Sequence, residues 1–138
     1  AMHGKNVASS LTGVVKQMSN SDSVYSYDLL LEKKMQMAYE EMKSLIEKIN
    51  RGKGVLLIYD MGSVKIMGKL ISKETGIDIR FIAAPSTMIA LETVKKMSSN
   101  DDLDDIMSEL EQSYQHYFPS IVENYHRQKR KMLLSLYV

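Results

Sequence analysis

Hydrophobic residues along this chain follow two patterns, one with the spacing of helices and one with the continuity of buried strands. Apolar residues three and four positions apart predict an amphipathic helix over roughly residues 5–18, formed around Val7, Leu11, Val14 and Met18. The remaining predicted elements, separated by turn residues, are a short strand at 24–27, a helix from Met35 to Ile49, a strand at 55–59, a helix ending near Thr75, a strand at 77–83, a helix with Met88, Leu91 and Val94, and a long helix from Asp101–Asp102 to Ile121 that Pro119 interrupts.

The apolar run at 55–59 is continuous rather than alternating, which predicts a strand covered on both faces, as in a parallel sheet. Strands and helices alternate with short connections. The predicted fold class is therefore α/β, a doubly wound and mainly parallel sheet with helices on both faces. Only Ala1 and Met2 precede His3. Either the first strand is truncated and continues upstream, or His3 belongs to a loose terminus.

Composition narrows the possible classes of function. A length of 138 residues fits one domain. The formal net charge of +1 indicates no strong electrostatic attraction to nucleic acid or a membrane. The absence of cysteine excludes disulfides and thiolate metal sites and fits a cytoplasmic protein. His3, His116 and His126 lack the spacing of metal ligands, and no apolar run approaches the about 20 residues of a membrane helix. We expect no metal, cofactor, direct nucleic-acid contact or membrane insertion.

Two short motifs place reactive groups at the ends of predicted strands. Asp60 follows the strand at 55–59, and His3 stands where a neighbouring strand would end. In open α/β sheets, ligands and reacting groups collect at the carboxyl ends of strands. A carboxylate bonded to one imidazole nitrogen leaves the other as a nucleophile, so His3 and Asp60 could carry a phosphoryl group. The ordinary alternatives are a solvated histidine and an aspartate that only caps the next helix.

The residues after His3 fit a phosphate pocket. Gly4 allows the backbone to approach a phosphate closely. The first amides of the following helix would face an anion on His3. Ser9 and Ser10 lie inside that helix, and we expect their hydroxyls to bond back to its backbone rather than contact a ligand.

Further donors follow the later strands. The backbone amides of Gly62 and Ser63 could bind phosphate, and so could the turn at Ser86–Thr87, although Thr87 serves equally well as a helix cap. A Walker loop is excluded, because five residues separate Gly62 from Gly68 and Leu70 stands where Ser or Thr is required.

The run from His3 to Leu11 resembles the phosphorylation-site motif of mannose-type IIA domains of the bacterial phosphoenolpyruvate:sugar phosphotransferase system. In that motif, His-Gly precedes a helix with small residues. The run Leu56–Ser63 is similar to the second active-site loop of the family, and Ala84–Met88 lies where the third loop should be. The resemblance covers roughly residues 2–110.

The resemblance implies a homodimeric α/β domain that takes phosphate from the phosphocarrier HPr and passes it to a IIB protein. By position, His3 would be phosphorylated with Asp60 as its carboxylate partner. Gly4, Gly62 and Ser63 would shape the pocket.

The loop Asp60–Ser63 separates this chain from transport domains, which usually carry a longer Asp-Leu-Phe-Gly-Gly-Ser-Pro loop. The short Asp-Met-Gly-Ser form, with Ala8–Ser10 behind His3, is more similar to IIA modules inside LevR-like transcriptional activators. The phosphocarrier subunit of dihydroxyacetone kinase, with Asp-Leu-Gly-Ser, is the nearest alternative.

We therefore predict that residues 1–125 form a phosphoryl-accepting domain and that 126–138, basic and then apolar, lead into another domain of a larger regulator. The phosphate would report sugar-transport flux, and activity as a phosphotransferase would be limited to accepting and passing on that group. One alternative is a phosphocarrier subunit of a sugar transporter or of a dihydroxyacetone kinase. A second is a non-catalytic interaction module with an inert His3.

Overall fold

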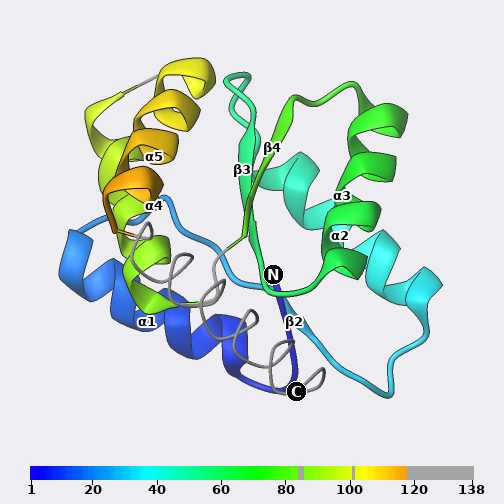
Figure 1. The fold of residues 1–138 in the computed structure, drawn as a ribbon. Coiled ribbons are helices and arrows are strands. Elements are labelled where there is room, and N and C mark those ends of the chain that lie inside the picture. The colour runs from blue at the N-terminus through cyan, green and yellow to red at the C-terminus, as the bar shows by residue number, and fades with distance from the viewer. Residues whose placement is uncertain (84–85, 101, 118–138) are drawn as a thin grey trace, which may run out of the picture.

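The computed structural model describes residues 1–83, 86–100 and 102–117 (Figure 1). Its elements are β1 (Met2–His3), α1 (Val7–Ser19), β2 (Asp28–Leu29), α2 (Met35–Ile49), β3 (Val55–Tyr59), α3 (Gly62–Thr75), β4 (Ile79–Ala83), α4 (Thr87–Ser99) and α5 (Leu103–Tyr117). The predicted α/β class and the alternation of strands and helices are confirmed. Pro119, Ile121 and the segment 126–138, on which further predictions fell, lie outside the described residues.

The strands form two parallel pairs. β1 pairs with β2, with Met2 opposite Asp28, and β3 pairs with β4 along its whole length. On its other side β1 meets β3, because the amine of Ala1 donates to the carbonyl oxygen of Ile58 at 2.7 Å. His3 is thus the last residue of a short strand that pairs with β2, and the interpretation as a loose terminus is wrong.

Helices cover both faces of the strands (Figure 1). Alternate residues of β3 pack on the two opposite faces of the strand. Val55 and Leu57 join a core with α2 and α3, whereas Leu56 and Ile58 pack on a core with α1, α4 and α5. This two-sided burial is the physical reason for the unbroken apolar run, and it holds the carboxyl end of β3 rigidly in place.

One close approach fixes α3 on the sheet. A Cβ atom at Gly68 would lie 2.6 Å from the Phe81 ring and 2.7 Å from a Leu57 methyl carbon. Glycine at this position lets the helix lie directly on β3 and β4. Because α3 begins at Gly62, this contact also sets the position of the residues that follow Asp60.

Two details differ from the sequence-based prediction. The short strand lies at Asp28–Leu29 and not at 24–27, because pairing with β1 selects the residues opposite Met2 and His3. The predicted apolar positions of α1 include Val7, Val14 and Met18, whose exposed fractions are 45%, 44% and 62%. The helix instead buries Ala8 and Val15, because that face packs against α4.

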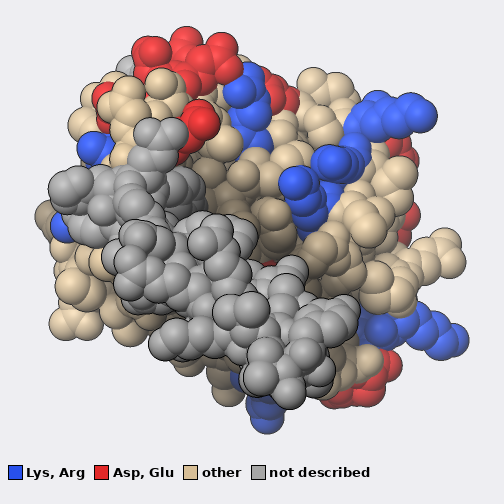
Figure 2. Space-filling model, viewed as in Figure 1, with Lys and Arg blue, Asp and Glu red and all other residues tan. Residues whose placement is uncertain are grey.

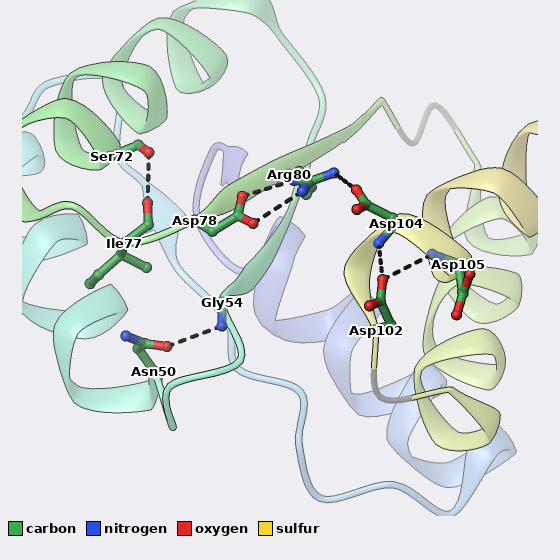
Figure 3. Close-up of polar contacts among 9 residues, drawn as sticks. All are labelled: Asn50, Gly54, Ser72, Ile77, Asp78, Arg80, Asp102, Asp104 and Asp105. Atoms are coloured by element: carbon green, nitrogen blue, oxygen red, sulfur yellow. Dashed lines mark hydrogen bonds and ion pairs between the residues drawn. The ribbon is translucent and has the colours of Figure 1, made fainter.

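The opposite end of the sheet is held by charged groups (Figure 3). Arg80 donates to both carboxylate oxygens of Asp78 and, from Nη1, to Asp104 at 2.7 Å. These contacts connect β4 to the start of α5. The carboxylate of Asp102 caps α5 by accepting from the amides of Asp104 and Asp105. This end of the sheet is structural and lies far along the strands from His3.

Acidic and basic side chains are mixed over the visible face (Figure 2). The carboxylates at the start of α5 form its clearest acidic group. Lys and Arg side chains form a diagonal row on the right of this view (Figure 2). No helix in the part of the chain that the structure describes is long and apolar enough to span a membrane.

Candidate functional site

Three side chains from distant parts of the sequence meet at the carboxyl ends of β1 and β3. Nδ1 of His3 lies 3.0 Å from Oδ1 of Asp60, and Nε2 of His3 lies 2.9 Å from Oγ of Ser63. The imidazole is thereby held between a carboxylate and a hydroxyl. The side chains of His3 and Asp60 are 16% and 25% exposed, so the group is sheltered and still reachable from solvent.

The backbone strengthens this arrangement. The amide of His3 donates to the second carboxylate oxygen of Asp60 at 2.8 Å, so both oxygens of Asp60 bind the same residue. Asp60 follows β3 directly, and Ser63 lies in the first turn of α3. The neighbouring strands β1 and β3 therefore bring His3 and Asp60 together, and the turn into α3 brings Ser63 to the other ring nitrogen.

The charge of Asp60 decides the tautomer of His3. Partial burial alone would raise the pKa of the Asp60 carboxyl, but the hydrogen bonds and the attraction from His3 bring that pKa below its usual range. An ionised carboxylate only accepts, so Nδ1 of His3 carries the hydrogen. In the neutral ring Nε2 then holds the lone pair, and the hydroxyl of Ser63 donates to it. Nε2 is therefore the ring nitrogen with the available lone pair.

Of the other predicted pocket residues, Gly4 and Gly62 are chain neighbours of His3 and Ser63, whereas Thr87 lies on a different helix. Gly4 follows His3 directly with φ of 101°, a conformation that L side chains rarely adopt. Gly62 opens α3 next to Ser63, and a Cβ there would meet nothing within 4 Å, so packing does not require glycine. Thr87 is exposed at the start of α4 and, among the described residues, makes no hydrogen bond to this group; Ser86 is the cap of that helix.

Sequence reasoning missed one polar residue beside the site. Asp28 of β2 accepts from the amide of Ser9 at 3.1 Å and from its hydroxyl at 2.8 Å. The expectation that Ser9 bonds back to its own helix is wrong. The start of α1 faces the Asp28 carboxylate rather than a group on His3, contrary to the expectation for its first amides. The missed signal is a carboxylate at a strand position, where an apolar residue is usual.

A large apolar cavity among the described residues lies apart from this group. A cavity of about 410 Å³ lies between α2, β3 and α4, lined mainly by apolar side chains, and it includes none of His3, Asp60 and Ser63. Within the described residues, no cluster of three or more His, Asp or Glu side chains is arranged to hold a metal ion. The His3 group therefore lies outside this apolar cavity and is partly exposed to solvent.

Fold and site together define an α/β domain with a paired histidine and aspartate at the carboxyl ends of adjacent parallel strands. The chain belongs to the mannose-type EIIA family, whose model, described as "PTS system fructose IIA component", matches residues 1–107. This confirms the resemblance seen in the sequence.

Two relatives add context. The chain is 27% identical over 141 residues to the transcriptional regulatory protein LevR of Bacillus subtilis (strain 168), and the match covers 99% of this chain and 14% of LevR. It is also similar to the crystal structure of a sigma-54 interaction domain protein from Enterococcus faecalis. That match has a TM-score of 0.75 and 30% identity, and it covers 91% of this chain and 92% of the other.

Proposed function

We propose that this chain is a phosphoryl-accepting IIA-like domain of a transcriptional regulator, with Nε2 of His3 as the acceptor atom. The observation that carries the proposal is the placement of His3 between Asp60 at Nδ1 and Ser63 at Nε2. A solvated histidine would need neither contact. An Asp60 that served only as a helix cap would not direct both carboxylate oxygens to His3.

The arrangement suits transfer from a phosphohistidine donor such as phospho-HPr. The lone pair of Nε2 attacks phosphorus, the new N–P bond forms, and the N–P bond of the donor breaks with its electron pair returning to the donor ring. The product ring keeps hydrogen on Nδ1 and gains positive charge. The ionised Asp60 carboxylate, 3.0 Å from Nδ1, stabilises that charge. Transfer of this kind needs positioning and charge stabilisation more than covalent chemistry by the protein.

Ser63 would change partner during the reaction. In the resting site its hydroxyl lies 2.9 Å from Nε2, so it must turn away when phosphorus approaches. It can then donate to a phosphoryl oxygen. The start of α3 supports the same group, because its cap residue Met61 makes no side-chain hydrogen bond to the first turn. The amides at Gly62 and Ser63 and the positive end of the helix dipole can therefore bind the phosphoryl oxygens.

The regulatory part of the proposal rests on the match to LevR, of which this chain spans only 14%. Phosphate on His3 would signal the state of sugar transport to other domains of a longer cytoplasmic protein. Residues 1–125 would form the accepting domain and 126–138 the connection to the next one. Such a domain would meet HPr through its open surface and would work as a homodimer.

The test is phosphorylation in the reconstituted cascade. The chain is incubated with phosphoenolpyruvate, enzyme I and HPr, and its intact mass is measured. One labile phosphoryl group should appear on the wild type and not on His3→Gln. A variant with both His116→Gln and His126→Gln is the matched control and should still be labelled. Labelling of His3→Gln, or an unlabelled but folded wild type, would contradict the proposal and favour an interaction module.

The main alternative, a phosphocarrier, is supported by the same site. It predicts that adding a mannose-family IIB protein or the remaining subunits of a dihydroxyacetone kinase discharges the phosphorylated chain rapidly. A regulatory domain should keep its phosphate under those conditions. The two functions are therefore separated by the rate of discharge and not by the rate of labelling.

A further inference from the structure

The first turn of α1 is capped by a residue from a different element. Its own cap residue, Asn6, has a left-handed φ of 65° and makes no side-chain hydrogen bond to the helix. The carboxylate of Asp28, 19 residues from Ser9, takes that role by binding both the amide and the hydroxyl of Ser9. The first turn of α1 is thus fastened to β2 through Ser9.

Strand β2 also contacts the start of the turn that connects His3 to α1. The amide of Gly4 donates to the carbonyl oxygen of Leu29 at 2.8 Å. Consecutive residues of β2 thus contact the chain on both sides of the turn at residues 4–6: Leu29 binds Gly4, and Asp28 binds Ser9 in α1. Two residues of the turn, Gly4 and Asn6, have positive φ angles, and this conformation is sterically unfavourable for Asn6. The bonds from Ser9 to Asp28 hold the helix that follows this turn.

We propose that Asp28 is a positioning residue of the His3 site, which rests on the phosphoryl-accepting function proposed above. By holding the start of α1 and the turn at residues 4–6, it keeps the imidazole of His3 in line with Asp60 and Ser63. Asp28 itself does not touch His3. Its side chain acts on the ring through the backbone of the turn, because His3 is the last residue of β1 and the turn begins at the next residue.

The charge of Asp28 has a second consequence. Burial alone would raise the pKa of its carboxyl, but the hydrogen bonds from Ser9 and the nearby backbone amides of Ala8 and Asn6 bring that pKa below its usual range. The carboxylate is therefore ionised at neutral pH and neutralises the positive end of α1. The positive end of α1 is then not available to a phosphoryl group on His3. The start of α3, where Ser63 lies, is the helix terminus that can bind this group.

The experiment compares Asp28→Asn and Asp28→Ala with a matched cap removal elsewhere. Asp102 caps α5 through the amides of Asp104 and Asp105, at the other end of the sheet, so Asp102→Ala loses the same kind of contact without reaching His3. For each protein we would measure the free energy of unfolding, the ring nitrogen spectrum of His3, and the rate of phosphoryl acceptance against phospho-HPr concentration.

Asp28→Ala and Asp102→Ala should lose comparable stability. Only Asp28→Ala should shift the His3 ring nitrogens and slow acceptance at saturating donor, by roughly ten- to a hundredfold, with the half-saturating donor concentration unchanged. Asp28→Asn, which still offers one amide oxygen to Ser9, should be slowed less. The proposal would be overturned if the Asp28 variants fold and show the same His3 ring spectrum and the same rate at saturating donor as Asp102→Ala.

The two proposals fail in different ways. If the wild type accepts no phosphate, the proposed function is wrong, and the ring spectrum alone still decides the role of Asp28. If the wild type is labelled and the Asp28 variants keep both spectrum and rate, the function stands and Asp28 serves only the stability of α1.

Discussion

Nδ1 of His3 and Oδ1 of Asp60 lie 3.0 Å apart although 57 residues separate them in the sequence. The contact arises because the chain at β1 lies beside the end of β3, where the amine of Ala1 also donates to the carbonyl oxygen of Ile58. The backbone amide of His3 binds the other oxygen of Asp60, so the carboxylate fixes both the ring and the chain that carries it. Each of the following predictions tests one part of this arrangement.

Asp60→Asn should slow phosphoryl acceptance without unfolding the domain. Asparagine can still accept one bond from His3, but it carries no charge to stabilise the ring as it becomes positive. We expect a loss of roughly ten- to a hundredfold, the range found when a carboxylate that orients a metal-ligating histidine is removed. Initial rates with phospho-HPr give the value, and circular dichroism checks the fold. An unchanged rate would reduce Asp60 to a structural residue.

Ser63→Ala should affect the phosphorylated state more than the resting one. The lost hydrogen bond to Nε2 costs at most about 1 kcal/mol of stability, because solvent can replace the hydroxyl at this half-buried position. Without a donor for the phosphoryl oxygens, the N–P bond should hydrolyse faster after the donor is removed. Decay of the labelled protein, followed by intact mass, measures this. Equal lifetimes in variant and wild type would show that Ser63 does not bind the phosphoryl group.

Acid should destabilise the domain through Asp28 and Asp60. Both carboxyls have a pKa below the ordinary value of 3.8 in the folded protein. Their contribution to stability is therefore complete above that ordinary value and is lost as the pH falls through the lower, folded pKa. The free energy of unfolding, measured by denaturant titration from about pH 5 downward, should fall less steeply in the double variant Asp28→Asn/Asp60→Asn. Parallel curves would contradict the assignment.

Gly68→Ala should destabilise the domain by about 1–3 kcal/mol, because the new methyl group would lie within 2.7 Å of Phe81 and Leu57. Gly13→Ala is the matched control, since a Cβ at Gly13 in α1 meets nothing within 4 Å. The control should gain about 0.5–1 kcal/mol from improved helix propensity. Thermal and denaturant unfolding give both values. A Gly68→Ala protein as stable as the wild type would mean that α3 can move away from the sheet at little cost.

Local signals in the sequence were sufficient for most of the fold. The strand at 55–59 and the helix from Met35 to Ile49 agree with the structure at both ends, because a continuous apolar run and glycine-containing turns mark them without reference to other segments. The position of β2 was missed for the opposite reason. Val24–Tyr27 has the residues of a strand, but the partner strand β1 selects Asp28 and Leu29.

The buried face of α1 shows a second limit of the sequence. Apolar residues occur on more than one side of this helix, and spacing alone cannot decide which side packs on α4. At the site, order along the strands was enough to predict that His3 and Asp60 meet. The role of Asp28 was not predictable in the same way, because the contact joins a helix terminus to a strand 19 residues away.

The acceptor atom can be identified directly. The chain is labelled with ¹⁵N in its histidines, phosphorylated through HPr, and examined by NMR for coupling between phosphorus and a ring nitrogen. The geometry, with hydrogen on Nδ1 toward Asp60, predicts that the coupled nitrogen is Nε2 of His3. Coupling to Nδ1, coupling to a different histidine, or no coupling in a folded protein exposed to active donor would contradict the proposed site.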